Sequence, residues 1–209
     1  MASPYVVGVT GGIATGKSAV MAILADFGAE CIDADVVYHE LIQPGQPLLE
    51  RLRTHFGNET IAADGHLDRR ALGAIVFADP VKLRELDALT HPAVINAIGG
   101  RVAHSESEVV AVEAVKLIES GLSARCDEIW LVVADPEVQR ARLMARAGLS
   151  RDEAGRRLAA QPDDAARRLV TDRVIDNYGT LDDLQFTVKG LWPLPSRSTD
   201  HVDPGEPAK

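Results

Sequence analysis

A glycine-rich segment near the N-terminus contains the residue types that can hold a polyphosphate. Residues 11–18 read GGIATGKS and satisfy the spacing G-x-x-x-x-G-K-[ST]. Glycines let the backbone curl so that successive N–H groups face one anion, and the N-terminus of a following helix adds partial positive charge. Lys17 can reach the β- and γ-phosphates, and the hydroxyl of Ser18 is a suitable Mg²⁺ ligand. We therefore predict that this loop binds ATP or GTP.

This loop by itself leaves kinases, GTPases, motors and switches as alternatives. A GTPase needs an N-K-x-D motif for base recognition, and the sequence contains none. The two D-x-x-G matches, at 152–155 and 176–179, come late in the chain and lack that motif. The sequence therefore favours a kinase over a guanine-nucleotide switch.

Two acids, Asp33 and Asp35, follow the second apolar strand-like run. Because the carboxyl ends of neighbouring parallel strands converge on one crevice, we expect both carboxylates near the γ-phosphate. A carboxylate there can accept a proton from an acceptor hydroxyl or hold Mg²⁺ through water. The alternative is that they cap the next helix. Since residues two apart point to different sides, we expect only one of them to handle the proton.

Positive charge is concentrated in residues 140–173, which hold nine arginines and five acids, while the whole chain has a net charge of −9. Arg142 and Arg146 are four residues apart, so they share a helix face and can bind one polyphosphate. A helical lid that brings arginines to the phosphoryl group and excludes water suits phosphoryl transfer. A solvated basic helix is the alternative, which we favour for Arg151, Arg168 and Arg173.

Alternating apolar strands and helical segments predict a parallel sheet that is covered on both faces. Gly148-Leu149-Ser150 should interrupt the last long helical stretch, with Ser150 and Glu153 forming a capping box. We also expect breaks at Asp79-Pro80 and His91-Pro92. We expect strands at 5–10, 30–32, 109–112, 128–134 and 174–176. We expect helices at 17–27, through most of 36–98, at 137–171 and at 181–191, and the third of these should break again near Pro162.

The composition is that of an ordinary globular protein, with 209 residues, 46% hydrophobic and 25% charged. A net charge of −9 argues against a nucleic-acid coat or a membrane-surface protein. Two cysteines make a disulfide framework or a cysteine zinc site improbable. The N-terminus has no basic leader, and the longest apolar run, 129–134, is too short to cross a bilayer. We expect a cytoplasmic protein with no nucleic-acid or membrane partner, and either a monomer or a weak oligomer.

These features together resemble the dephospho-coenzyme A kinase family over about residues 5–184. The phosphate loop is widely shared among kinases, but its combination with the other segments is much more specific. The matching segments are TGGIATGKS at 10–18, IDAD at 32–35, LDRRAL at 67–72, VF at 76–77, LTHP at 89–92 and VIDN-x-G at 174–179, with Gln139, Arg142, Arg146, Arg157 and Gln161 between them.

The resemblance implies that ATP, with Mg²⁺, phosphorylates the ribose 3′-hydroxyl of dephospho-coenzyme A, the last step of coenzyme A synthesis. It also implies an α/β fold, a three-layer P-loop kinase with a central parallel sheet, a helical substrate-binding insertion and a small helical lid. We expect the nucleotide-binding core at 1–35 and 99–192, the lid at about 140–165 within it, the substrate region at 36–98 and a disordered tail at 193–209.

Matching positions also imply roles for individual residues. Asp35 would be the general base, Lys17 and Arg146 would stabilise the transferred phosphoryl group, and Thr10 would lie close to the acceptor. Mg²⁺ would be held by Ser18. ATP would contact Gly12, Ile13, Ala14, Thr15, Gly16, Lys17, Ser18, Ala19, Arg142, Asn177 and Gly179, the last two at the adenine. Substrate would contact Asp33, Asp35, His91 and Glu113, and we add Lys116 on its charge alone, since that position does not match the family. Taken alone, His91 is equally compatible with a helix cap or a core contact.

The sequence departs from the family pattern at two places. In residues 113–119, EAVKLIE, Val115 and Lys116 replace a Pro and a Leu, and Lys116 could meet a substrate phosphate instead. Ala147 stands where an acid is usual, which affects contacts at the lid hinge. Neither change removes a group that the chemistry needs. The remaining alternatives are another small-molecule P-loop kinase, for a nucleoside, nucleotide or sugar, and a nucleotide-binding switch without catalysis.

Overall fold

The computed structural model describes residues 3–161, 164–192 and 194. The expected break near Pro162 lies outside these residues, as does the predicted disorder of 193–209 except at Leu194. There the prediction is wrong, because Leu194 is buried in the core, on which the partly buried Trp192 also packs.

A parallel five-stranded sheet forms the centre of the molecule, in the order β2-β3-β1-β4-β5. The central strand β1 is buried along almost its whole length, which explains why its sequence, YVVGVT, is apolar on both faces. The strands are β1 (Tyr5–Thr10), β2 (Glu30–Asp33), β3 (Val109–Glu113), β4 (Glu128–Val133) and β5 (Arg173–Asp176). All five predicted strands are confirmed to within one residue at either end.

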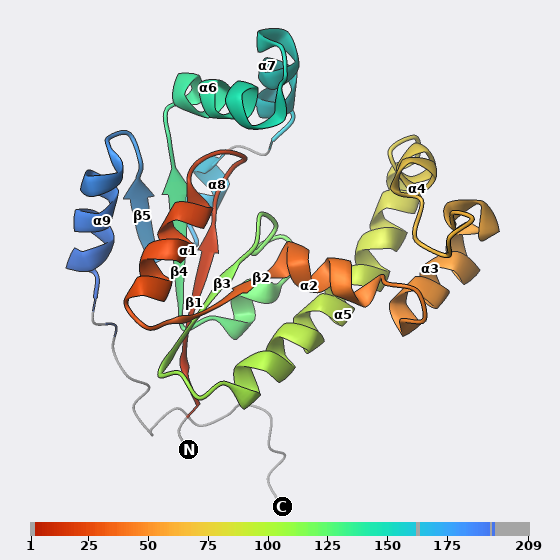
Figure 1. The fold of residues 1–209 in the computed structure, drawn as a ribbon, viewed down its shortest axis with the longest axis horizontal. Coiled ribbons are helices and arrows are strands. Elements are labelled where there is room, and N and C mark those ends of the chain that lie inside the picture. Colours follow the sequence, from red (N-terminus) through yellow and green to blue (C-terminus); the bar gives the residue numbers. More distant parts are fainter. Residues whose placement is uncertain (1–2, 162–163, 193, 195–209) are drawn as a thin grey trace, which may run out of the picture.

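Helices cover both faces of the sheet and give the three predicted layers (Figure 1). α1 (Lys17–Asp26) and α9 (Leu181–Gly190) pack on one face through a core that includes Val7, Leu24 and Trp130. On the other face, α2 (Ala34–Leu41) and α5 (Pro80–His104) pack on a core with Val110 and Leu117. Each face of the sheet therefore has its own apolar core. The site residues lie along the edge of the sheet between these two cores.

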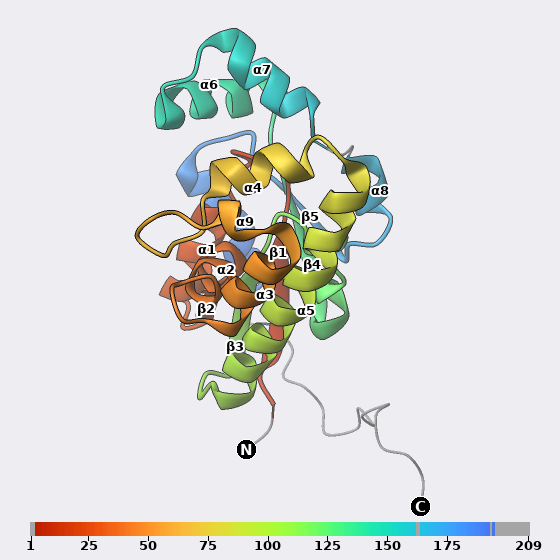
Figure 2. The same ribbon diagram turned by 90° about the vertical axis from the view of Figure 1, so that its right-hand side faces the viewer.

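A helical region extends to one side of the sheet and contains α3 (Pro47–Phe56), the 3₁₀ helix η1 (Asn58–Thr60) and α4 (Arg69–Val76) (Figures 1 and 2). It has a separate core around Leu49, Leu52 and Leu72. The predicted break at His91-Pro92 is wrong, because α5 continues through Pro92. Proline removes one backbone hydrogen bond, but packing of α5 against three other helices outweighs that loss.

Two helices, α6 (Pro136–Ala147) and α7 (Arg151–Ala159), lie beyond the carboxyl ends of the strands (Figure 1). Gly148 ends α6 in a left-handed conformation with φ 61°, and Ser150 and Glu153 form the predicted capping box of α7. The short helix α8 (Asp164–Arg168) lies between α7 and the sheet (Figure 2), and the 3₁₀ helix η2 (Leu122–Arg125) precedes β4.

Candidate active site

The phosphate loop joins β1 to α1 and takes backbone conformations that require glycine. Gly11 has φ 146° and Gly16 has φ 105°, and a Cβ on Gly16 would overlap the side-chain amide of Asn177. Helix α1 begins at this loop without a side-chain cap and without an acid in its first turn. Its first N–H groups therefore stay available for a ligand, and the sign of the helix dipole suits an anion.

Two glutamines from the lid side bind the loop at Ile13. The Oε1 atom of Gln161 accepts a hydrogen bond from the backbone N–H of Ile13 at 2.5 Å. Gln139 donates from Nε2 to the carbonyl oxygen of Ile13 at 3.1 Å. Because Gln139 lies in α6 and Gln161 follows α7, these bonds connect α6 and the end of α7 directly to the phosphate loop.

On the other side of the loop, Arg142 and Asn177 bind the same carbonyl group. Arg142 donates from Nη1 to the carbonyl oxygens of Ala14 and Thr15, at 3.3 and 3.2 Å. The buried Asn177 donates from Nδ2 to the carbonyl oxygen of Thr15 at 2.8 Å. Both predicted nucleotide-binding residues therefore touch the loop backbone, although they come from α6 and from the end of β5.

Lys17 is buried at the start of α1, where its ammonium donates to the carbonyl oxygen of Gly12 at 3.0 Å. The same Nζ atom lies 4.0 Å from Oε1 of Glu113 at the end of β3. Burial lowers the pKa of Lys17, an effect that Glu113 and Asp35 oppose. Burial likewise raises the pKa of Glu113, against the opposing effect of Lys17 and of the hydroxyl of Ser18. Both groups are thus partly removed from water, and a phosphate bound beside Lys17 would favour the charged form of the lysine.

Asp33 and Asp35 take different positions, as their spacing predicts. Asp33 is the N-cap of α2 and accepts hydrogen bonds from the backbone N–H groups of Asp35 and Val36, at 2.8 and 3.4 Å. The helix-cap alternative therefore holds for Asp33. Asp35, in the first turn of α2, keeps its carboxylate exposed on the side of a cavity.

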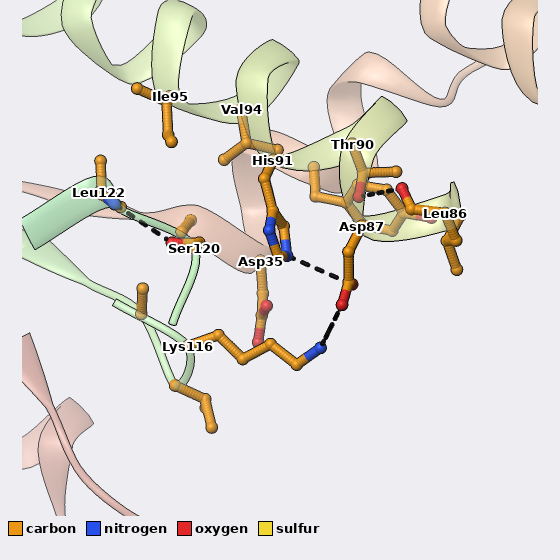
Figure 3. A pocket seen from close by; sticks show the side chains of 14 residues that line it. Asp35, Leu86, Asp87, Thr90, His91, Val94, Ile95, Lys116, Ser120 and Leu122 are labelled. Carbon is orange, nitrogen blue, oxygen red and sulfur yellow. Dashed lines mark hydrogen bonds and ion pairs between the residues drawn. The ribbon is translucent and has the colours of Figure 1, made fainter. Parts of the chain in front are cut away.

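That cavity, of about 400 Å³, lies between α2, α5 and the segment that follows β3. His91 on α5 and Lys116 after β3 both point to the carboxylate of Asp87, at 3.3 Å each (Figure 3). Burial lowers the pKa of His91, and the nearby Lys116 adds to this while Asp87 opposes it. The rest of the wall is mainly apolar and includes Leu86, Val94, Ile95, Val115 and Leu122. Asp35, His91 and Lys116, which are far apart in the sequence, therefore meet in one cavity.

The other predicted site residues lie at or beside these two features. Thr10 is buried at the end of β1, where its hydroxyl donates to the carbonyl oxygen of Val115 at 3.2 Å. Ser18 is exposed in the first turn of α1, and Ala19 follows it half-buried. Gly179 is exposed before α9. Arg146 is exposed in the last turn of α6, and among the described residues no hydrogen bond or ion pair joins it to the loop.

Sequence reasoning missed several residues of the site. It gave no role to Gln139 or Gln161, although both were among the marks of the family resemblance. It also missed Asp87, whose position four residues before His91 on a helix was the available signal. Arg167 was counted only as part of the basic segment, yet it is 4% exposed and ion-paired with Glu119. Nothing in the local sequence distinguishes it from its exposed neighbour Arg168.

The donor groups at the loop fit Mg²⁺ bound together with a nucleotide rather than by the protein alone. Within 3–161, 164–192 and 194, no three His, Cys, Asp or Glu side chains gather as a metal site. Mg²⁺ commonly keeps few protein ligands and takes the remainder from substrate phosphates and water. The exposed hydroxyl of Ser18 at the N-terminus of α1 suits that arrangement. No helix in the described part of the chain is long and apolar enough to cross a membrane.

Comparisons of this chain with a family model, with curated proteins and with solved structures point to the same family. Residues 5–183 match the family model described as dephospho-CoA kinase. The dephospho-CoA kinase of Symbiobacterium thermophilum is 45% identical over 97% of this chain and 84% of its own. Among solved structures, a Thermus thermophilus protein is 35% identical with a TM-score of 0.78, over 90% of this chain and 96% of its own. The dephospho-CoA kinase of Campylobacter jejuni is 26% identical with a TM-score of 0.65, over 89% of this chain and 94% of its own.

Proposed function

The chain belongs to the dephospho-CoA kinase family, and from that premise we propose how its residues transfer a phosphoryl group from ATP to the ribose 3′-hydroxyl of dephospho-CoA. The observation that carries the proposal is that Lys17 of the phosphate loop lies close enough to Asp35, on the wall of the cavity, for their charges to interact. Their arrangement suits a nucleotide donor and a separate alcohol acceptor.

On the nucleotide side, the ATP phosphates bind along residues Gly12 to Ala19, with Ser18 holding Mg²⁺. Mg²⁺ supplies charge neutralisation between the phosphates when it is bound. Lys17, already within reach of the loop, stabilises negative charge on the transferred group.

Arg142 and Asn177 keep the backbone of Ala14, Thr15 and Gly16 in a conformation that receives the phosphates. Asn177 and Gly179 lie toward the adenine.

On the acceptor side, Asp35 accepts the proton of the 3′-hydroxyl. Its carboxylate is exposed to the cavity, and the cap that Asp33 provides fixes the helix turn from which it projects. Thr10 lies at the same edge of the sheet and borders the acceptor. Glu113, whose Oε1 lies 4.0 Å from the ammonium of Lys17, limits where the hydroxyl can approach. His91 and Lys116 bind polar groups of the acceptor, and the ammonium of Lys116 suits its phosphates.

The helices α6 and α7 form the lid that closes over the bound phosphates. Gln139 and Gln161 already connect this lid to the loop, which supports a role in nucleotide binding. Arg146 is exposed, so a closing movement would be needed to bring it to the phosphoryl group.

We propose that residues 36–98 are the acceptor-binding region. We also propose that the enzyme is cytoplasmic, acts without a nucleic-acid or membrane partner, and is a monomer or weak oligomer.

The test is an ADP-release assay with ATP, Mg²⁺ and a panel of acceptors: dephospho-CoA, adenosine, AMP and a hexose. We expect turnover on dephospho-CoA, with coenzyme A identified as the product by mass spectrometry. The Lys17→Met variant, prepared in the same way, controls for a contaminating kinase. Turnover on another acceptor with none on dephospho-CoA would replace this proposal with that of a different small-molecule kinase.

A further inference from the structure

Arg167 is a buried arginine outside the set of residues assigned above. It lies in α8, and its side chain is only 4% exposed. A buried guanidinium is costly unless its charge and its donors have partners. Arg167 has them: Nε and Nη2 donate to Oε1 of Glu119 at 3.0 and 2.7 Å, and Nη1 lies 3.6 Å from Oδ1 of Asp164. This is a specific, well-partnered position rather than a solvated charge.

A further bond takes Arg167 to the wall of the acceptor cavity. Its Nη2 atom donates to the carbonyl oxygen of Val115 at 3.2 Å. The same carbonyl oxygen accepts the hydroxyl of Thr10, also at 3.2 Å. A carbonyl oxygen has two lone pairs and can accept both bonds. Arg167 from α8 and Thr10 from the end of β1 therefore hold one backbone group between them.

The segment held in this way, residues 114–120, supplies one side of the cavity. Val115, Lys116 and Ser120 line it, and Glu119 is the partner of Arg167. The segment lies between the sheet edge and α5, where Lys116 pairs with Asp87 (Figure 3). Arg167 also lies close enough to Lys17 for its positive charge to contribute to the lowered pKa of that lysine.

We infer that Arg167 is a positioning residue, which holds segment 114–120 against the end of β1 and so sets the shape of the acceptor cavity. This inference rests on the proposed function, because it concerns the binding of dephospho-CoA. It assigns Arg167 no contact with the reacting atoms. In the chain, α8 follows the lid helices α6 and α7 (Figures 1 and 2). The bond from Arg167 to Val115 therefore also connects the segment after the lid to the wall of the acceptor cavity.

The experiment compares Arg167→Met, Arg167→Lys and Glu119→Gln with the double variant of Arg167→Met and Glu119→Gln. We expect Arg167→Met to raise KM for dephospho-CoA about tenfold and lower kcat about tenfold, with KM for ATP changed less than about twofold, since a small misplacement of a binding wall has effects of this order. Arg167→Lys should recover part of the loss, because one ammonium can keep the ion pair but not the geometry of the guanidinium. The double variant should be no worse than the worse single variant, since both remove one shared interaction.

The adjacent Arg168→Met is the matched control, because Arg168 is an exposed arginine of the same short helix. It should keep wild-type KM and kcat for both substrates. Tm is measured for every variant. In Arg167→Met, the carboxylate of Glu119 is 37% exposed and can be hydrated, so the variant should still fold.

The inference is overturned if Arg167→Met leaves KM for dephospho-CoA unchanged, if KM for both substrates rises equally in proportion to a loss of Tm, or if the effects of the two single changes multiply in the double variant. A wild-type enzyme that turns over another acceptor but not dephospho-CoA would instead overturn the proposed function, and the two failures are thereby distinct.

Discussion

The phosphate loop and the acceptor cavity share one edge of the sheet but are assembled from the sequence in different ways. The loop is a continuous segment, 11–18, whose backbone does most of the binding. The cavity takes Asp35 from α2, His91 from α5 and Lys116 from the segment after β3. A site that one segment forms with its backbone tolerates sequence changes in the neighbouring elements. A site built from the side chains of several elements depends on how those elements pack.

The two regions also differ in charge. At the loop, Lys17 is buried and its partners are a carbonyl group and the partly protected Glu113. In the cavity, Lys116 is half exposed and already paired with Asp87. Removing a buried cation at the reacting phosphate should therefore have a much larger effect than removing a partly exposed cation at the acceptor.

The largest effect is expected for Lys17→Met. Loss of a preorganised cation at the transferred phosphoryl group should reduce kcat/KM about 10³-fold, with weaker ATP binding as well. Steady-state kinetics with varied ATP, and calorimetric titration of the nucleotide, measure the two effects. Lys189→Met, in the exposed last turn of α9, removes the same charge away from the site and should behave as wild type. Near-normal turnover in Lys17→Met would contradict the assigned role.

Asp35→Asn should be next, because it removes the proposed proton acceptor but keeps the size of the side chain. General-base catalysis is worth about 10²-fold or more, so kcat should fall by at least that factor while KM for ATP stays nearly unchanged. Asp182→Asn, an exposed acid in the first turn of α9, is the matched control. If kcat in Asp35→Asn stays within a few-fold of the wild type, another group takes the proton.

Lys116→Leu should have a smaller effect, confined to the acceptor. A partly exposed cation of this kind is worth about a threefold to fivefold change in KM for dephospho-CoA, and the difference should shrink as salt is added. Lys82→Leu removes an equal charge from the exposed face of α5 and controls for net charge. A change in KM for ATP instead of dephospho-CoA would show that Lys116 belongs to the nucleotide side.

The smallest effect concerns the pH dependence of stability through His91. Because burial lowers the pKa of His91 below its ordinary 6.5, the unfolded chain binds this proton more readily than the folded protein. The contribution of neutral His91 to the free energy of unfolding is therefore fully present above pH 6.5 and is lost as pH falls toward the lowered pKa. Denaturant unfolding at several values between pH 5 and 8 should show a shallower decline in the free energy of unfolding for His91→Gln than for the wild type. Parallel curves would indicate that His91 titrates as if unfolded.

The difference between the two regions also explains what the sequence could predict. Gly11, Gly16, Lys17 and Ser18 lie in one motif, so the loop and its helix are predictable from spacing alone. The buried strands are equally clear, because their apolar runs have few other structural uses. The local chemistry of His91-Pro92 predicts a break, whereas packing along α5 sustains the helix through Pro92.

The acceptor side was harder to predict, because its contacts cross long intervals of sequence. Family resemblance named His91, and a departure from the family pattern drew attention to Lys116, but neither pointed to the carboxylate of Asp87 that both of them face. Arg167 was indistinguishable from Arg168 in the sequence, and only burial in the fold separates them. Residues that bind ligands through the backbone can be read from a motif, whereas residues that hold other segments in place cannot.

The most direct test of this division is a crystal structure of the enzyme with dephospho-CoA and a non-hydrolysable ATP analogue. The distance to measure joins the ribose 3′-oxygen to the nearer carboxylate oxygen of Asp35. We predict a hydrogen bond of about 2.6–3.2 Å, the range that proton transfer needs, with the analogue's phosphates on the loop at Lys17. A ribose that binds elsewhere, with its 3′-oxygen out of reach of Asp35, would contradict the assignment of the cavity to the acceptor.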